Sequence, residues 1–188
     1  ITGLIGQYAH GNEPSHGFAY LYTRSAKLHL TDLLVAKVMR ELYSDAPDGL
    51  SGNEDCGQMS AWYVWSALGL YPLTPGSTGL AFGMPLFDAA TVTLPEGRSL
   101  VIRSSAQSGV RTHIERVMWN GTVRQRAGAI TQDELLAGGT LSFELGPRAV
   151  DHPVQLPDDQ VAMEPPPAPI VHAKSPVFSD SITVSITS

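Results

Sequence analysis

The sequence predicts an α+β chain in which a helical region precedes a region of short antiparallel strands. The spacing of apolar residues changes near residue 75, from the three-to-four-residue period of helices to the two-residue period of strands. Turns containing glycine or proline separate the apolar runs after that point, as is typical of short strands. We therefore expect the last helices of a larger helical array, followed by β structure.

The N-terminal region contains two predicted helices joined by a polar loop. Thr31 and Asp32 can serve as N-cap or first-turn groups of the first helix, which is expected to end near Tyr43. Residues 44–57 (SDAPDGLSGNEDCG) have the composition of a loop. The run QMSAWYVWSALGLY then predicts a second helix that is apolar on nearly all sides, so we expect it to be buried among other helices.

The β region contains five short apolar runs that we expect to form an antiparallel sheet. Pro95–Gly97 and Asn120–Gly121 predict turns between strands, the second being a favoured pair for a tight hairpin. The run QDELLAGG predicts a single helical turn ended by glycine. The five predicted strands lie within residues 80–87, 90–94, 99–105, 113–119 and 140–145.

Composition divides the chain into four segments. The predicted helices occupy residues 1–76, and the antiparallel β region occupies residues 77–147. Residues 148–169 include three consecutive prolines and predict an extended linker. Residues 170–188 regain strand character, as expected for the start of a truncated β module. Both ends resemble cuts through a longer protein, so we expect a fragment.

Charge, hydropathy and cysteine content exclude several classes of protein. Twelve basic and eighteen acidic residues give a net charge of −6 without a basic cluster, which argues against a nucleic-acid partner. No apolar run approaches the roughly 18 to 20 residues of a membrane span. The single cysteine, Cys56, excludes an internal disulfide and is expected to be a small buried packing residue.

Two polar loops carry the candidate chemistry, HGNEPSH at residues 10–16 and GNEDCGQ at residues 52–58. In each, a carboxylate neighbours an amide and a glycine, which offers oxygen atoms suited to calcium or sugar hydroxyls, whereas neither loop fits zinc. For His10 and His16 we favour hydrogen-bonded loop residues over metal ligands.

Structural roles are open for the same acidic and aromatic residues. Asp55 lies three residues before Gln58, where a carboxylate could equally cap a helix. Glu13 precedes a proline and could be a polar turn residue. For Trp62 and Trp65 we favour core packing over a sugar-binding platform.

The two loops, together with GMPLFDAATVTLPEGRSLVI and the Trp-Asn-Gly hairpin, resemble the C-terminal part of glycoside hydrolase family 92 over residues 1–147. Members of this family are calcium-dependent, exo-acting, inverting α-mannosidases. The resemblance implies that the chain supplies the last helices of an (α/α)6 catalytic barrel and the β structure that follows. It also implies a secreted or periplasmic enzyme, with mannose-containing glycans and the upstream part of the same polypeptide as partners.

The resemblance also implies roles for individual residues. Asp55 matches the general base, and Asn53 stands where the family has a second aspartate that orients the attacking water. Because the general acid comes from earlier in the barrel, the chain alone is expected to be inactive. The implied mannose-binding residues are Asn12, Glu13, His10 and Glu54, and the implied Ca²⁺ ligands are Glu13, Asn12 and Asp55.

An alternative of a different class stays open at this point. The chain could be a non-catalytic carbohydrate-binding or structural β-module with a helical lead-in. In that case Asp55 and Glu13 would only cap a helix and contact solvent.

Overall fold

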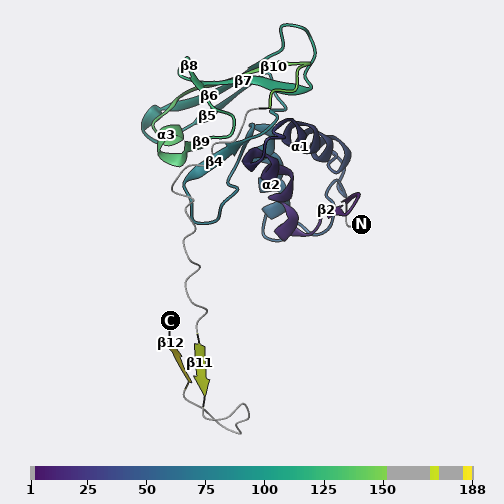
Figure 1. Ribbon diagram of the computed structural model, residues 1–188, viewed down its shortest axis with the longest axis vertical. Helices are drawn as coiled ribbons and strands as arrows, with labels where there is room; N and C mark the ends of the chain where they lie inside the picture. The colour runs from purple at the N-terminus through teal and green to yellow at the C-terminus, as the bar shows by residue number, and fades with distance from the viewer. Residues whose placement is uncertain (1–2, 152–169, 174–183, 188) are drawn as a thin grey trace. The chain divides into compact units, whose positions relative to one another are not determined.

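The computed structural model describes residues 3–151, 170–173 and 184–187. The chain divides into two compact units, Ile1–Val154 and Gln155–Ser188. In the larger unit, Figure 1 shows helices α1 (His29–Glu41) and α2 (Gln58–Ala67) on one side and the main sheet, with the short helix α3 (Gln132–Leu136) beside it, on the other. The predicted α+β class, with helices first and strands second, is confirmed.

The helical part begins with a small hairpin and two 3₁₀ segments. Strands β1 and β2 pair antiparallel, and the 3₁₀ segments η1 and η2 follow them before the first α-helix. The bounds are Leu4–Ile5 for β1, Tyr8–Ala9 for β2, Glu13–Ser15 for η1, Phe18–Arg24 for η2, His29–Glu41 for α1 and Gln58–Ala67 for α2.

Both predicted helices exist, but α2 is shorter than expected. Helix α1 starts at His29, so Thr31 and Asp32 lie in its first turn, which is one of the two roles predicted for them, and Asp32 is fully buried. Helix α2 stops before Gly69, whose φ of +79° favours glycine and at which a Cβ would lie 2.8 Å from the Phe143 ring.

Helix α2 is not enclosed on every side by the part of the chain that the structure describes. Met59 and Trp62 are buried, as core packing predicts for this tryptophan, whereas Val64 is 56% exposed. Trp65 is half-buried and packs against both hydrophobic clusters of the larger unit, one within the helical part and one within the β part. The expected burial on nearly all sides is therefore incomplete.

The main sheet has five strands in the order β5-β6-β10-β7-β8. Strand β10 lies between β6 and β7 and is parallel to β6 but antiparallel to β7. The prediction of a purely antiparallel sheet is wrong at this pair, because β6 and β7 run in opposite directions and a strand between them must be parallel to one. The bounds are Ala89–Thr93 for β5, Ser99–Ser105 for β6, His113–Trp119 for β7, Thr122–Arg124 for β8 and Gly139–Gly146 for β10.

A second sheet takes the order β3-β4-β9, so the apolar run predicted as the first strand of the main sheet lies here instead. That run is also shorter than predicted, since β4 ends at Phe82. The bounds are Leu70–Tyr71 for β3, Gly79–Phe82 for β4 and Ala129–Thr131 for β9.

Local turn chemistry follows the sequence closely. Asn120 and Gly121 have φ of 49° and 80° and join β7 to β8, which confirms the predicted hairpin. Pro95–Gly97 forms the 3₁₀ turn η3 between β5 and β6. The predicted helical turn is α3 (Gln132–Leu136), which begins with a capping box formed by Thr131 and Glu134.

In the smaller unit, β11 (Ile170–Ala173) and β12 (Val184–Thr187) pair antiparallel, in line with the strand character predicted there. The predicted proline-rich linker lies, beyond Asp151, outside the described residues.

A buried ion pair joins the helical part to the main sheet. Arg126 donates to Asp32 Oδ1 from Nη2 at 2.5 Å and to Asp32 Oδ2 from Nη1 at 3.0 Å. The backbone N–H of Ile114 in β7 donates to Asp32 Oδ2 at 3.0 Å. Both charged side chains are almost completely buried, so the pair fixes α1 against the edge of β7.

We expect Asp32→Asn to lower the free energy of unfolding by about 3 to 5 kcal/mol, because it leaves the Arg126 guanidinium buried without a counter-charge. Urea unfolding of the protein and its variants measures this loss. The matched control is Glu41→Gln, also on α1, which breaks the exposed 3.8 Å pair with Lys37 and should cost less than about 0.5 kcal/mol. Equal losses in the two variants would contradict the prediction.

Candidate active site

The two polar loops singled out in the sequence lie against each other. Gly52 has a φ of +89°, and a Cβ at this position would lie 3.0 Å from Gly11 Cα and 3.2 Å from Gly11 O. A side chain would therefore push the loops apart. The contact brings together two loops that are about 40 positions apart in the sequence.

Glu13 and Asp55, one from each loop, are close enough to share a hydrogen bond. That hydrogen bond and the charge of Glu13 raise the pKa of Asp55. The backbone N–H of Glu13 itself, and then the hydrogen bond with Asp55, lower the pKa of Glu13. Of the two carboxyl groups, Asp55 therefore holds a proton more readily.

The loop that carries Asp55 has an unusual backbone. Asp55, Cys56 and Gly57 have φ of 42°, 58° and 88°, so three consecutive residues adopt the left-handed conformation. Two of them are not glycine, which costs about 1 to 2 kcal/mol for each such residue. Cys56 lies exposed on this turn, and the expectation that it is a buried packing residue is wrong.

Helix capping does not account for the Asp55 side chain. The N-cap of α2 is Gly57, and no side chain bonds to the helix from that position. Glu54 serves the first turn instead, because its Oε1 accepts from Ser60 N at 3.1 Å and its Oε2 accepts from Ser60 Oγ at 2.9 Å. Asp55 is exposed and its side chain makes no capping contact with α2, whereas both carboxylate oxygens of Glu54 accept from Ser60.

His10, expected among the mannose-binding residues, is completely buried. Its Nδ1 lies 2.7 Å from the Tyr8 hydroxyl, and its Nε2 lies 2.6 Å from the Tyr43 hydroxyl. Burial lowers its pKa to about 3, so the ring is neutral near pH 7. The structure therefore gives His10 no surface for a sugar, and we correct that expectation.

His16 is also buried and neutral. Its Nε2 donates to the His10 carbonyl at 2.9 Å, and its Nδ1 accepts from the Gln58 side-chain amide at 3.2 Å. The Trp62 Nε1–H donates to the His16 carbonyl at 3.0 Å. Burial lowers the pKa of His16. Both histidines are hydrogen-bonded loop residues, as the sequence favoured.

The remaining site residues from the sequence lie at the surface. Asn12 is exposed, and its Nδ2 donates to Ser15 Oγ at 3.1 Å. Asn53 is also exposed and lies two positions before Asp55 in the same loop. Both amides are therefore accessible to solvent beside the carboxylate pair.

The donor set fits part of a calcium shell. Oε1 of Glu13 is buried and has no hydrogen-bond partner within the part of the chain that the structure describes. The Asp55 carboxylate lies close to the Glu13 side chain. Calcium binds carboxylate and amide oxygens of this kind. Among the described residues, no group of three or more histidine, cysteine, aspartate or glutamate side chains could hold a metal ion. Two carboxylates and the Asn12 amide are therefore a partial set.

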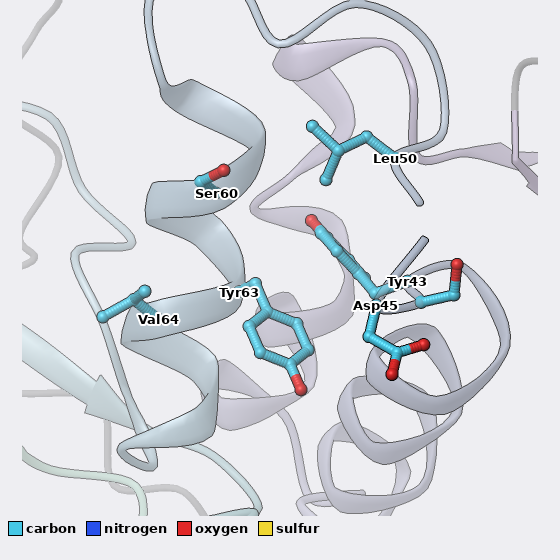
Figure 2. A pocket seen from close by; sticks show the side chains of 7 residues that line it. Tyr43, Asp45, Leu50, Ser60, Tyr63 and Val64 are labelled. Atoms are coloured by element: carbon cyan, nitrogen blue, oxygen red, sulfur yellow. The ribbon is translucent and has the colours of Figure 1, made fainter. Parts of the chain in front are cut away.

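A cavity of about 440 Å³ opens between the end of α1 and the first turns of α2 (Figure 2). Tyr43 and Tyr63 form part of its wall, and the same Tyr43 hydroxyl bonds to His10. No motif in the sequence indicated a role for Tyr43, because the sequence pattern marks this residue only as the expected end of a helix. The lining residues are Tyr43, Ser44, Asp45, Leu50, Ser60, Tyr63 and Val64.

Comparisons with known proteins agree with this arrangement. Residues 1–147 match the family model of the glycosyl hydrolase family 92 catalytic domain. An uncharacterized secreted glycosidase of Arthroderma benhamiae is 30% identical over 141 residues, which cover 72% of this chain and 18% of that protein.

Two solved structures from Bacteroides thetaiotaomicron are similar as well. A family GH92 α-mannosidase superimposes with a TM-score of 0.73 at 32% identity, covering 84% of this chain and 23% of that one. A family GH92 inverting mannosidase gives a TM-score of 0.66 at 42% identity, covering 74% and 19%.

The chain thus spans between 18% and 23% of the length of these three relatives. The family match includes both polar loops, helices α1, α2 and α3, and the main sheet. The chain belongs to glycosyl hydrolase family 92.

Proposed function

We propose that this chain is part of an inverting, exo-acting α-mannosidase that hydrolyses terminal α-mannosides of glycans. The carboxylate pair of Glu13 and Asp55 is the observation that carries the proposal. Family membership and the mannosidases among its structural relatives support the substrate class. In this proposal the chain contributes the general base and part of a calcium and mannose subsite.

Asp55 is the proposed base. An inverting glycosidase uses a carboxylate to take a proton from water on the face opposite the general acid, with the two carboxyl groups about 6.5 to 9.5 Å apart. Asp55 is exposed, free of capping contacts and raised in pKa by Glu13, which makes it a better proton acceptor than an ordinary aspartate. Asn53 is proposed to hold the water, since an amide can orient a water but cannot accept its proton.

The same pair and Asn12 are proposed to hold calcium. Glu13, Asn12 and Asp55 would contribute oxygen ligands, and the unpartnered Oε1 of Glu13 supports this assignment. When bound, the ion would supply a positive contact for sugar hydroxyl groups. Asn12, Glu13 and Glu54 are the proposed mannose contacts.

We further propose that residues 1–76 are the last helices of an (α/α)6 barrel completed by the upstream part of the polypeptide. Phe18, Leu21 and Val64 are each more than half exposed, which supports burial against further helices. Residues 77–147 would then be the β region, 148–169 the linker and 170–188 the start of a β module.

We also propose a secreted or periplasmic location. The fungal relative is named as secreted. Within the described residues, no helix has the length and apolar character needed to cross a bilayer.

We expect Asp55→Asn to reduce kcat by about 10² to 10⁴, because the amide keeps the shape of the loop but cannot take the proton. Mannose release is measured with the polypeptide that carries the rest of the catalytic domain. The 188-residue chain alone should release none, because the general acid is proposed to lie upstream.

Asp48→Asn is the matched control, since Asp48 is exposed in the loop that precedes this site and should leave kcat unchanged. If the Asp55→Asn enzyme melts like the parent and keeps more than about a tenth of parental kcat, Asp55 is not the base.

We expect Glu13→Gln to raise the calcium concentration for half-maximal binding by about tenfold or more, because it removes one ligand charge. Titration of the calcium-stripped enzyme by calorimetry measures this change. Glu41→Gln, an exposed change on α1, should leave the affinity unaltered. Equal affinities in both variants would remove Glu13 from the ligand set.

A further inference from the structure

We propose that His10 and Tyr43 are positioning residues that fix the loop of Glu13 relative to the loop of Asp55. This inference rests on the proposed function, because it assigns the task of setting the geometry of the carboxylate pair. Neither residue touches the reacting groups. They act through a chain of hydrogen bonds from Tyr8 to the main chain of α2.

The hydrogen-bond partners define the tautomer of His10. The Tyr43 hydroxyl has one proton, which it donates to the Met59 carbonyl at 2.9 Å. Its oxygen must therefore accept from His10 Nε2 at 2.6 Å, so the ring proton is on Nε2. Nδ1 is then an acceptor, and the Tyr8 hydroxyl donates to it at 2.7 Å. Every donor in this series of hydrogen bonds has one acceptor.

The chain of bonds joins three segments that are distant in sequence. Tyr8 lies in β2, Tyr43 follows the end of α1, and Met59 is in the first turn of α2. The backbone N–H of Met59 in turn donates to the Glu54 carbonyl at 3.3 Å, next to Asp55. A second connection runs through the Gln58 side chain to His16, whose backbone N–H donates to the Glu13 carbonyl at 2.9 Å.

Aromatic rings pack closely around His10. Its ring stacks on His16 with centroids 4.7 Å apart and meets the Trp62 ring edge-on at 4.5 Å. His10 is completely buried, so a ring nitrogen that loses its partner is costly to leave unsatisfied. Loss of either bond must therefore be met by movement of the loop or by a buried unsatisfied group.

Four variants test the proposal in the enzyme that carries the whole catalytic domain. His10→Phe and Tyr43→Phe remove bonds while keeping an aromatic ring. His10→Gln keeps one donor and one acceptor and is the rescue variant. Tyr63→Phe is the matched control, because its ring lies 4.8 Å from that of Tyr43 and its hydroxyl makes no hydrogen bond within the described part of the chain.

We expect His10→Phe and Tyr43→Phe to lower kcat by about 10- to 100-fold, with KM within about threefold, because a misplacement near 1 Å costs up to about 10² in rate. His10→Gln and Tyr63→Phe should keep kcat within about threefold of the parent. Melting curves fix an assay temperature at which all variants are folded. Parental kcat in Tyr43→Phe, or equal losses in His10→Gln and His10→Phe, would overturn the proposal.

A second measurement is independent of mannosidase activity. Nitrogen-15 histidine NMR of the parent, assigned by the signal missing from His10→Gln, should show the His10 proton on Nε2. A proton on Nδ1 would overturn the proposed chain of hydrogen bonds whatever the enzyme assay shows. Loss of kcat in Tyr43→Phe but not in Asp55→Asn would keep the positioning role and reject Asp55 as the base.

Discussion

The contact between residues 10–16 and residues 52–58 is the constraint on which the candidate site depends. Glu13 belongs to one loop and Asp55 to the other, so their carboxylates meet only if the loops do. Gly52 allows this close approach, because a Cβ there would lie only 3.0 Å from Gly11 Cα. Buried histidines on one side of the contact and the first turn of α2 on the other then hold it in one arrangement.

The cost of this arrangement is visible in the backbone of the Asp55 loop. Left-handed conformations at Asp55 and Cys56 are unfavourable for residues with a Cβ. Such conformations persist where the surroundings determine them more strongly than local preference. Here the backbone N–H of Gln58 bonds to the Asp55 carbonyl, and Glu54 is tied to Ser60 on α2. These hydrogen bonds to α2 thus stabilise an unfavourable turn beside the carboxylate pair.

The sequence predicted the turns and other local features of the fold well. The Asn120–Gly121 hairpin and the turn of α3 follow from residues within a few positions of one another, and both are present. Helix α1 and the two polar loops were also found from short-range pattern. The resemblance of the loops to a known family supplied roles that their composition alone left open.

The features that the sequence did not predict all depend on distant partners. The sequence pattern predicts that Asp32 lies at the start of a helix, but it does not predict the buried ion pair with Arg126, which is 94 positions away. The direction of β10 depends on which strands flank it, and the enclosure of His10 depends on Tyr43, 33 positions later. Apolar period and turn residues carry no information about such pairings. For the same reason Glu54, rather than Asp55, took the capping role.

The place of β10 in the sheet has a consequence for how the chain folds. It is the last of the five strands in sequence but lies at the centre of their order, so β6 and β7 cannot complete their pairing until residues 139–146 are available. Until then each presents an open edge, the kind of surface on which strands from other molecules add. Contacts between segments far apart in sequence also form slowly. Self-association during synthesis or refolding should therefore be decided in the interval before β10 inserts.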